Sequence, residues 1–281
     1  MTDLVECYRG GVLIQECDAF GHLNIAYYIE RFADAGYELL QRLAPNARWT
    51  TRAIATRYVT ELRAGDPIVI ASGIIRIDAA TLTLGHVATN GMGGPATTVA
   101  EEIVALDAPD GEAWAELRAS LDASKAAWTE MPFDPVKLPE KSGPVATGLA
   151  RVKTNEAGDD GRLSLFGFVN RFSTANLVNM NAAGMTSTYM REQNRGFATF
   201  ETRLELFGPA PALGEGVSTN SGMLEVGRSS VKILHEMRLQ RGQRVARYYQ
   251  AGVHFDLQAR RSSALPDELR VNASRLVITA D

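Results

Sequence analysis

The sequence lacks most of the features that mark a specialised binding or membrane protein. Only two cysteines, Cys7 and Cys17, occur, which argues against a disulfide framework and fits a reducing cytoplasm. The histidines are scattered, so no metal-ligand cluster is expected. No apolar run approaches a membrane span, and the first six residues carry no signal-peptide pattern. A formal net charge of −4 without a basic cluster argues against nucleic-acid binding. These absences predict a soluble cytoplasmic protein.

What is present is an ordinary globular composition, with 45% hydrophobic and 22% charged residues. A strand is expected at 4–15, and apolar residues at steps of three or four predict a helix over 24–43. Further strands are expected at 52–62, 68–77, 81–89 and 97–106, with a second helix at 112–128. This order predicts an α+β fold, an antiparallel sheet wrapped on one long helix.

The second half of the chain repeats the first. Prolines gather at 131–145, which we interpret as a linker between a unit at 1–130 and a unit at 146–281. Residues 16–23 match 156–163 at an offset of 140 (156 − 16), Ala55-Thr56 match Ala198-Thr199 at 143 (198 − 55), and His86 matches His235 at 149 (235 − 86). The collinear matches predict a tandem duplication. The shared histidines are expected to be structural.

One acid, Asp18, stands in the bend between the first strand and the first helix. Unpaired backbone N–H groups and the positive end of a helix dipole collect at such a place. In the second copy Gly158, Arg162 and Ser164 replace Asp18, His22 and Asn24, whereas Gly21 has a counterpart in Gly161. The pattern predicts one working site and one degenerate site. A shifted register could still place Asp159 or Asp160 in the second bend.

The spacing Asp-x-x-Gly-His-x-Asn-x-x-x-Tyr carries a family resemblance. These residues, Asp18, Gly21, His22, Asn24 and Tyr28, resemble the signature of the hot-dog-fold acyl-CoA thioesterases of the 4-hydroxybenzoyl-CoA thioesterase type. The resemblance covers residues 5–107 and, less closely, 146–269. It implies a double hot-dog, in which two fused units stand for what is elsewhere a homodimer.

The resemblance also implies roles for the residues of the bend. Asp18 would act as nucleophile or as general base for water on a thioester carbonyl, and the Ile25 N–H would hold the carbonyl oxygen. His22 would orient the loop, and Asn24 would either cap the helix or bind the attacking water. Tyr28 would lie in the core or line the acyl pocket. No metal or cofactor is implied, because coenzyme A is part of the substrate.

The rest of the expected substrate site is less defined. The acyl group would be carried by coenzyme A or, as the second choice, by an acyl-carrier protein. Besides Gly21 and Tyr28, we expect arginines of the second unit to meet the phosphates and its phenylalanines to shape the acyl tunnel: Arg162, Arg171, Arg228, Phe166, Phe168 and Phe172.

Other interpretations of the same residues stay open. Asp18 could be only a turn or capping acid, and the basic run Arg241–Arg247 is interpreted as a solvated strand face. The chain could be a non-catalytic acyl-binding or assembly module. A hot-dog hydratase or dehydratase is disfavoured, because the sequence has no Asp-x-x-x-Pro-x-His segment. A fused pair could be a monomer, but we expect a homo-oligomer.

Overall fold

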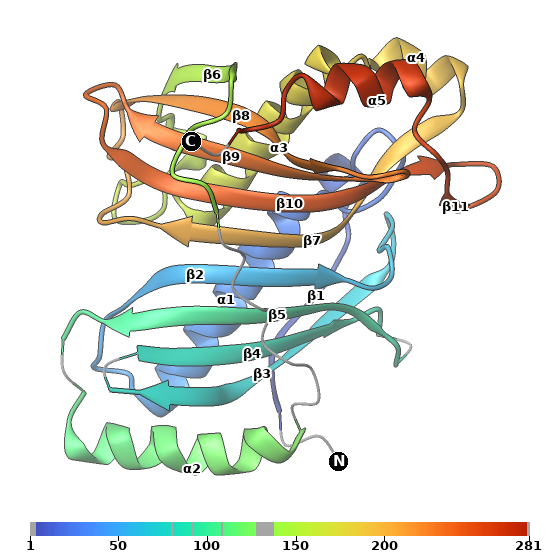
Figure 1. Ribbon diagram of the computed structural model, residues 1–281. Coiled ribbons are helices and arrows are strands. Elements are labelled where there is room, and N and C mark those ends of the chain that lie inside the picture. The colour runs from blue at the N-terminus through green and yellow to red at the C-terminus, as the bar shows by residue number, and fades with distance from the viewer. Residues whose placement is uncertain (1–3, 80, 92, 108, 128–137, 280–281) are drawn as a thin grey trace. The chain divides into compact units, whose positions relative to one another are not determined.

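The helix that follows the Asp18 bend is α1 (Ile25–Leu43), and it begins at the N-cap residue Asn24. The structure is a computed structural model that describes residues 4–79, 81–91, 93–107, 109–127 and 138–279. The chain divides into two compact units, residues 1–134 and 135–281. In the first unit, α1 lies against the sheet (Figure 1). Phe32 and Leu39 on its apolar stripe are buried. The predicted helix over 24–43 is confirmed.

The sheet of the first unit is antiparallel throughout and has the order β1-β3-β4-β5-β2. Its strands are β1 (Val5–Gly11), β2 (Trp49–Tyr58), β3 (Pro67–Asp78), β4 (Thr81–Thr89) and β5 (Pro95–Ala105). The short helix η1 (Ile14–Glu16) leads into the bend, and α2 (Gly111–Ala127) packs along β3. At that contact Gly73 is required, because a Cβ there would lie 2.2 Å from Ser124 Oγ. Every predicted element of this unit is present, with ends that shift by a few residues.

The second unit repeats this plan. Its sheet order is β7-β10-β9-β8-β6, again antiparallel. The repeated elements are β6 (Val145–Arg151), η2 (Thr154–Glu156), α3 (Leu165–Ala182), β7 (Arg195–Leu206), β8 (Gly216–Val226), β9 (Ser230–Leu239) and β10 (Arg244–Asp256). The additions are α4 (Ser187–Glu192), β11 (Arg261–Ser262) and α5 (Asp267–Ser274). Among the described residues, no helix combines the length and apolarity needed to cross a membrane.

The strand pairing corrects one part of the predicted repeat alignment. Ala55 pairs with Ala100 in the first unit, and Arg203 pairs with Tyr249 in the second. Since 100 and 249 correspond at the offset of 149 (249 − 100), Ala55 corresponds to Arg203 at 148 (203 − 55), and its predicted match to Ala198 is wrong. Eight residues (148 − 140) are inserted between α3 and β7, where α4 lies. A two-residue match could not locate that insertion.

The predicted linker at 131–145 is only partly described. Its residues up to 137 and Trp128 at the end of the predicted second helix lie outside the described residues. Residues 138–144 pack onto the sheet of the second unit, where a Cβ on Gly143 would lie 2.0 Å from the backbone carbon of Ser221. The described part of the predicted linker therefore belongs structurally to the second unit.

Candidate active site

The bend at Asp18 is a tight hairpin between η1 and α1. The Asp18 N–H donates to the His22 carbonyl at 2.8 Å, and the Gly21 N–H donates to the Asp18 carbonyl at 3.0 Å. Gly21 has a φ of +77°, a left-handed conformation that favours glycine. An isolated bridge between Cys17 and Leu23 closes the hairpin. The turn therefore fixes where Asp18 stands relative to the start of α1.

The Asp18 carboxylate is exposed and is held by the turn itself. Its Oδ1 accepts hydrogen bonds from the backbone N–H groups of Phe20, at 2.8 Å, and His22, at 3.1 Å. These bonds are those of an acid in an Asx-turn. They also limit the rotation of the carboxylate while it remains open to solvent. Asp18 thus has the turn role, and the geometry leaves it accessible to a substrate.

The first turn of α1 carries one unused donor. Asn24 caps the helix, because its Oδ1 accepts from the Ala26 N–H at 3.0 Å. The Asn24 N–H donates to the Glu16 carbonyl at 2.9 Å. In the described part of the chain, the Ile25 N–H has no hydrogen-bond acceptor. This N–H stands at the positive end of the helix dipole and is available to a ligand oxygen.

His22 lies in a small charged cluster that the sequence did not reveal. Its Nε2 is 3.1 Å from Glu61 Oε2 and 3.0 Å from Arg63 Nη2. A neutral Nε2 accepts from Arg63, whereas a protonated Nε2 donates to Glu61, so the proton decides which neighbour is bonded. The bridge between His22 and Arg63 sets this contact. The only sequence signal was the nearby Gly65-Asp66-Pro67 turn, which returns the chain to the bend.

Tyr28 belongs to the core of the first unit. Its ring packs edge-on against Tyr58 at 5.4 Å, and its Oη accepts from the Leu62 N–H at 3.2 Å. Burial raises the pKa of Tyr28 to about 12, so its hydroxyl is neutral at physiological pH. Tyr28 ties α1 to the segment that carries Glu61 and Arg63. Of its two predicted roles, core and acyl-pocket lining, the contacts assign the core role.

The second bend keeps the turn and lacks the acid. The Gly158 N–H donates to the Arg162 carbonyl at 2.8 Å, the Gly161 N–H donates to the Gly158 carbonyl at 3.0 Å, and Gly161 has a φ of +70°. The Arg162 side chain is exposed and donates to the Ala210 carbonyl at 2.8 Å. Asp160 Oδ1 accepts from the Arg162 N–H at 2.9 Å, so this acid serves the turn.

Arg171, a predicted phosphate contact, is committed to an ion pair. Its Nε and Nη2 donate to Glu156 Oε1 and Oε2 at 2.9 and 2.7 Å, and Nη2 also reaches the Arg151 carbonyl at 2.7 Å. The first unit has the same pair, with Arg31 Nη2 2.7 Å from Glu16 Oε2. The pair ties each long helix to the segment before its bend. This occupancy disfavours the predicted contact of Arg171 with a substrate phosphate.

The predicted phenylalanines differ in their surroundings. Phe172 is fully buried and stacks on Tyr248, with ring centroids 5.1 Å apart and planes 4° apart. Phe168 is also buried, whereas Phe166 is half-buried. Phe168 and Phe172 therefore fill the core of the second unit. Phe166 lies at the start of α3 and is only half-buried. Its predicted contact with an acyl group therefore stays a prediction.

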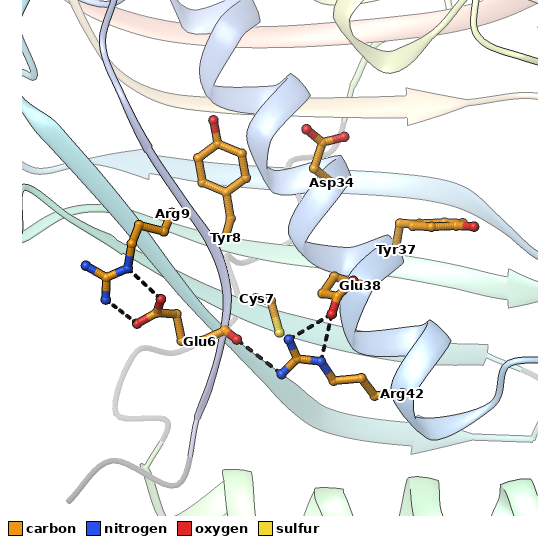
Figure 2. Close-up of a pocket in the computed structure, with 8 residues that line it drawn as sticks. All are labelled: Glu6, Cys7, Tyr8, Arg9, Asp34, Tyr37, Glu38 and Arg42. Carbon is orange, nitrogen blue, oxygen red and sulfur yellow. Dashed lines mark hydrogen bonds and ion pairs between the residues drawn. The ribbon is translucent and has the colours of Figure 1, made fainter.

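One surface hollow lies elsewhere in the first unit. It measures about 440 Å³, lies between β1 and α1, and is shown in Figure 2. Its lining residues are Glu6, Cys7, Tyr8, Arg9, Asp34, Tyr37, Glu38 and Arg42. Arg9 is paired with Glu6, and Arg42 with Glu38. None of the predicted site residues lines it. Within the described residues, no three His, Cys, Asp or Glu side chains could together hold a metal ion.

Comparisons with known proteins bear on the fold and the family. A family model described as thioesterase-like superfamily matches residues 12–141 and 163–272. No curated protein matches the chain. The structure of an acyl-ACP thioesterase from Bacteroides thetaiotaomicron gives a TM-score of 0.62 at 8% identity, covering 89% of this chain and 98% of that one. The 12:0-ACP thioesterase from Umbellularia californica gives 0.61 at 10%, covering 88% and 93%. The predicted fold of two tandem hot-dog units is confirmed.

Proposed function

Since the chain belongs to the thioesterase-like superfamily, we propose that it hydrolyses an acyl thioester at the Asp18 bend. The observation that carries the proposal is the pairing of two groups at the start of α1. An exposed carboxylate is oriented by two backbone N–H groups, and the nearby Ile25 N–H has no acceptor in the described part of the chain. Such a pair supplies an attacking or proton-accepting group and a donor for the developing oxyanion.

The reaction follows from these two groups. The thioester carbonyl oxygen accepts a hydrogen bond from the Ile25 N–H. This hydrogen bond strengthens as negative charge builds on that oxygen. Losing one such donor typically costs about 3 kcal/mol of transition-state stabilisation. Asp18 then either takes a proton from the attacking water or attacks the carbonyl carbon itself. In the first case the water oxygen bonds to the carbonyl carbon, the C–S bond breaks, and the thiolate leaves. In the second case Asp18 forms a mixed anhydride, releases the thiolate, and is regenerated by water.

His22, Glu61 and Arg63 support the bend. Arg63 and Glu61 both contact Nε2 of His22, and these contacts fix its ring against the segment before β3. Asn24 holds the first turn of α1 and so aims the Ile25 N–H. We assign these residues a positioning role, because their side chains bond to one another or to the backbone.

The substrate is proposed as an acyl group on coenzyme A, with an acyl-carrier protein as the alternative carrier. The Asp18 motif resembles that of the acyl-CoA enzymes of the 4-hydroxybenzoyl-CoA type, whereas the two solved structures named above are acyl-ACP thioesterases. Gly158 leaves the second bend without the acid, so we assign one active bend to the chain.

Thiol release from a panel of acyl-CoA and acyl-carrier-protein thioesters tests the proposal. The Asp18→Asn variant is well suited, because an asparagine Oδ1 can keep both turn bonds while losing the base. We expect release to fall at least a hundredfold, with the fold unchanged by circular dichroism. Asp159→Asn, in the second bend, is the matched control and should keep the wild-type rate.

Three outcomes would count against this assignment. Release that survives Asp18→Asn places the chemistry elsewhere. Tight acyl-CoA binding without release from any thioester indicates a binding module, and addition of water to an enoyl-CoA indicates a hydratase. Nucleophile and general base are separated by intact-mass measurement, since only a nucleophilic Asp18 gains the mass of the acyl group.

A further inference from the structure

The basic run that the sequence suggested to be a solvated strand face is partly buried. Arg244 and Arg247 of β10 and Arg238 of β9, here called the arginine cluster, surround one carboxylate, Glu236. The Glu236 side chain is 1% exposed and that of Arg247 is 5% exposed. The interpretation as a solvated face therefore fails for Arg247. Arg244 and Arg247 share the buried Glu236 because Glu236 lies opposite Arg247 in the β9–β10 pairing.

Glu236 orients the cluster through the Nε atoms of its arginines. Its Oε2 accepts from Arg244 Nε at 2.7 Å and from Arg247 Nε at 3.0 Å, and its Oε1 accepts from Arg238 Nε at 2.7 Å. Burial alone would raise the pKa of Glu236, but donors from Ser142 and the arginine cluster outweigh it and lower that pKa. Glu236 is therefore ionised. Arg238 Nη1 donates to the Gly242 carbonyl at 2.8 Å, whereas the terminal nitrogens of Arg244 and Arg247 are directed to another acceptor.

The terminal nitrogens of two arginines converge on one residue, Glu140. Arg244 Nη1 donates to Glu140 Oε2 at 3.1 Å, and Arg244 Nη2 donates to the Glu140 carbonyl at 3.1 Å. Arg247 Nη2 donates to the same carbonyl at 3.2 Å and lies 3.7 Å from Oε2. The Glu140 side chain is 85% exposed, so water competes for its carboxylate. The cluster carries three positive charges and encloses one buried negative charge, that of Glu236. The exposed side chain of Glu140 supplies the second negative charge.

The duplicated fold does not require this cluster. At the offset of 149, the first unit has Val87, Thr89, Pro95 and Thr98 in place of Glu236 and the three arginines. Those positions form the same β4–β5 pairing without any charge. Ordering three arginines around a buried carboxylate costs free energy. The first unit forms the same strand pairing without such a cluster, so the sheet itself does not require it.

We propose that the arginine cluster is a binding site for a phosphate group, and that Glu140 occupies it when no ligand is bound. Arginine forks fixed at Nε present paired donors that match phosphate oxygens. A phosphomonoester or diphosphate offers more charge and more acceptor oxygens than one exposed carboxylate, so it displaces Glu140. The source of the phosphate, the nucleotide part of coenzyme A, rests on the proposed function. The phosphate chemistry does not.

Calorimetric titration of the full chain with adenosine 3′,5′-bisphosphate tests the site, with adenosine as the phosphate-free probe. We expect the bisphosphate to bind and adenosine not to bind. Arg244→Gln should weaken binding about tenfold or more, the effect of losing one charge-assisted pair. Glu140→Gln should tighten it about fivefold, because a competing carboxylate is removed. Arg270→Gln and Glu225→Gln, which break exposed pairs in the same unit, are the matched controls.

The Glu140→Gln variant separates a ligand site from a structural clamp. If the cluster is only a structural clamp, neither wild type nor Glu140→Gln should bind the bisphosphate. Arg244→Gln and Glu140→Gln should then only have a lower melting temperature, and that result would overturn the proposal. Inorganic phosphate and pyrophosphate, titrated in the same way, show whether free phosphate is as good a ligand as the nucleotide. If both bind with the same response to the variants, the phosphate site stands with a free anion as its source.

A phosphate-free thioester keeps this test apart from the proposed hydrolysis. An N-acetylcysteamine thioester should be hydrolysed equally by wild type and by Arg244→Gln, whereas the KM for an acyl-CoA should rise in the variant. Bisphosphate binding without hydrolysis of any thioester would refute the enzyme and leave the site. Hydrolysis without bisphosphate binding would do the reverse.

Discussion

Buried His235 makes the stability of the second unit depend on pH. Its side chain is fully buried, its Nδ1 is 2.6 Å from Ser221 Oγ, and the rings of Phe172 and Tyr248 lie about 6 Å away. Burial lowers its pKa from 6.5 to about 3, and an interaction with the Gln250 side chain opposes that shift. The native unit therefore holds neutral His235 under conditions in which the unfolded chain takes up a proton.

The sign and size of the effect follow from this difference. Stability from neutral His235 is complete above pH 6.5 and is lost as pH falls from 6.5 toward about 3. One pKa unit corresponds to about 1.4 kcal/mol. A pH of 5 is about 1.5 units below the pKa of His235 in the unfolded chain. The free energy of unfolding is therefore about 2 kcal/mol lower at pH 5 than at pH 7.5. The loss is still incomplete at that pH.

Amide hydrogen exchange of peptides from β8 and β9 measures this loss. All three tryptophans, Trp49, Trp114 and Trp128, lie before residue 135, so the second unit has no tryptophan of its own. Exchange is compared at pH 7.5 and 5.0 after correction for the intrinsic rates, in wild type and in His235→Asn, whose amide can keep the bond to Ser221. Other titrating groups cancel in the difference, and we expect about 2 kcal/mol less pH dependence in the variant.

Two results would refute this reasoning. One is equal pH dependence in wild type and His235→Asn. The other, which remains informative if the variant does not fold, is a wild-type second unit whose stability is flat between pH 6 and 5, where a slope of about 1.2 kcal/mol per pH unit is expected. His22→Asn, in the first unit, is the control for a general effect of removing a histidine.

Further predictions concern the framework of the two bends. Gly21→Ala and Gly161→Ala should each cost about 1 kcal/mol, because both positions have positive φ, yet only Gly21→Ala should slow thiol release. Equal slowing by both would contradict a single active bend. Arg171→Gln leaves Glu156 buried without its partner and should cost about 3 kcal/mol by denaturant unfolding, with an unchanged KM for acyl-CoA. A raised KM would restore Arg171 as a substrate contact.

Local patterns in the sequence predicted the elements well. The three- and four-residue spacing of apolar residues in α1 needed no tertiary information. The position of α4 could not be predicted in this way, since six residues, Ser187–Glu192, are too short to show a helical period. The alignment error at Ala55 followed from that missed insertion.

Contacts between distant side chains were the part that sequence could not supply. His22 meets Glu61 and Arg63 only because the chain after β2 returns to the bend. Arg171 was expected to be free for a phosphate, although its pairing with Glu156 depends on how α3 packs near η2. A sign of that pairing was present in the repeat, because Glu16 and Arg31 recur at the same offset of 140 (156 − 16, 171 − 31).

The duplication separates residues that serve the fold from residues that serve a ligand. A position needed to form the unit must be kept in both copies, as the Glu–Arg pairs, the left-handed glycines and the buried histidines are. A side chain that is costly to place and occurs in one copy needs another reason. Asp18 is such a residue in the first unit, and the arginine cluster is such a group in the second. The two units thus diverged in opposite chemical senses: the first keeps a carboxylate at its bend, and the second gathers cations on its sheet.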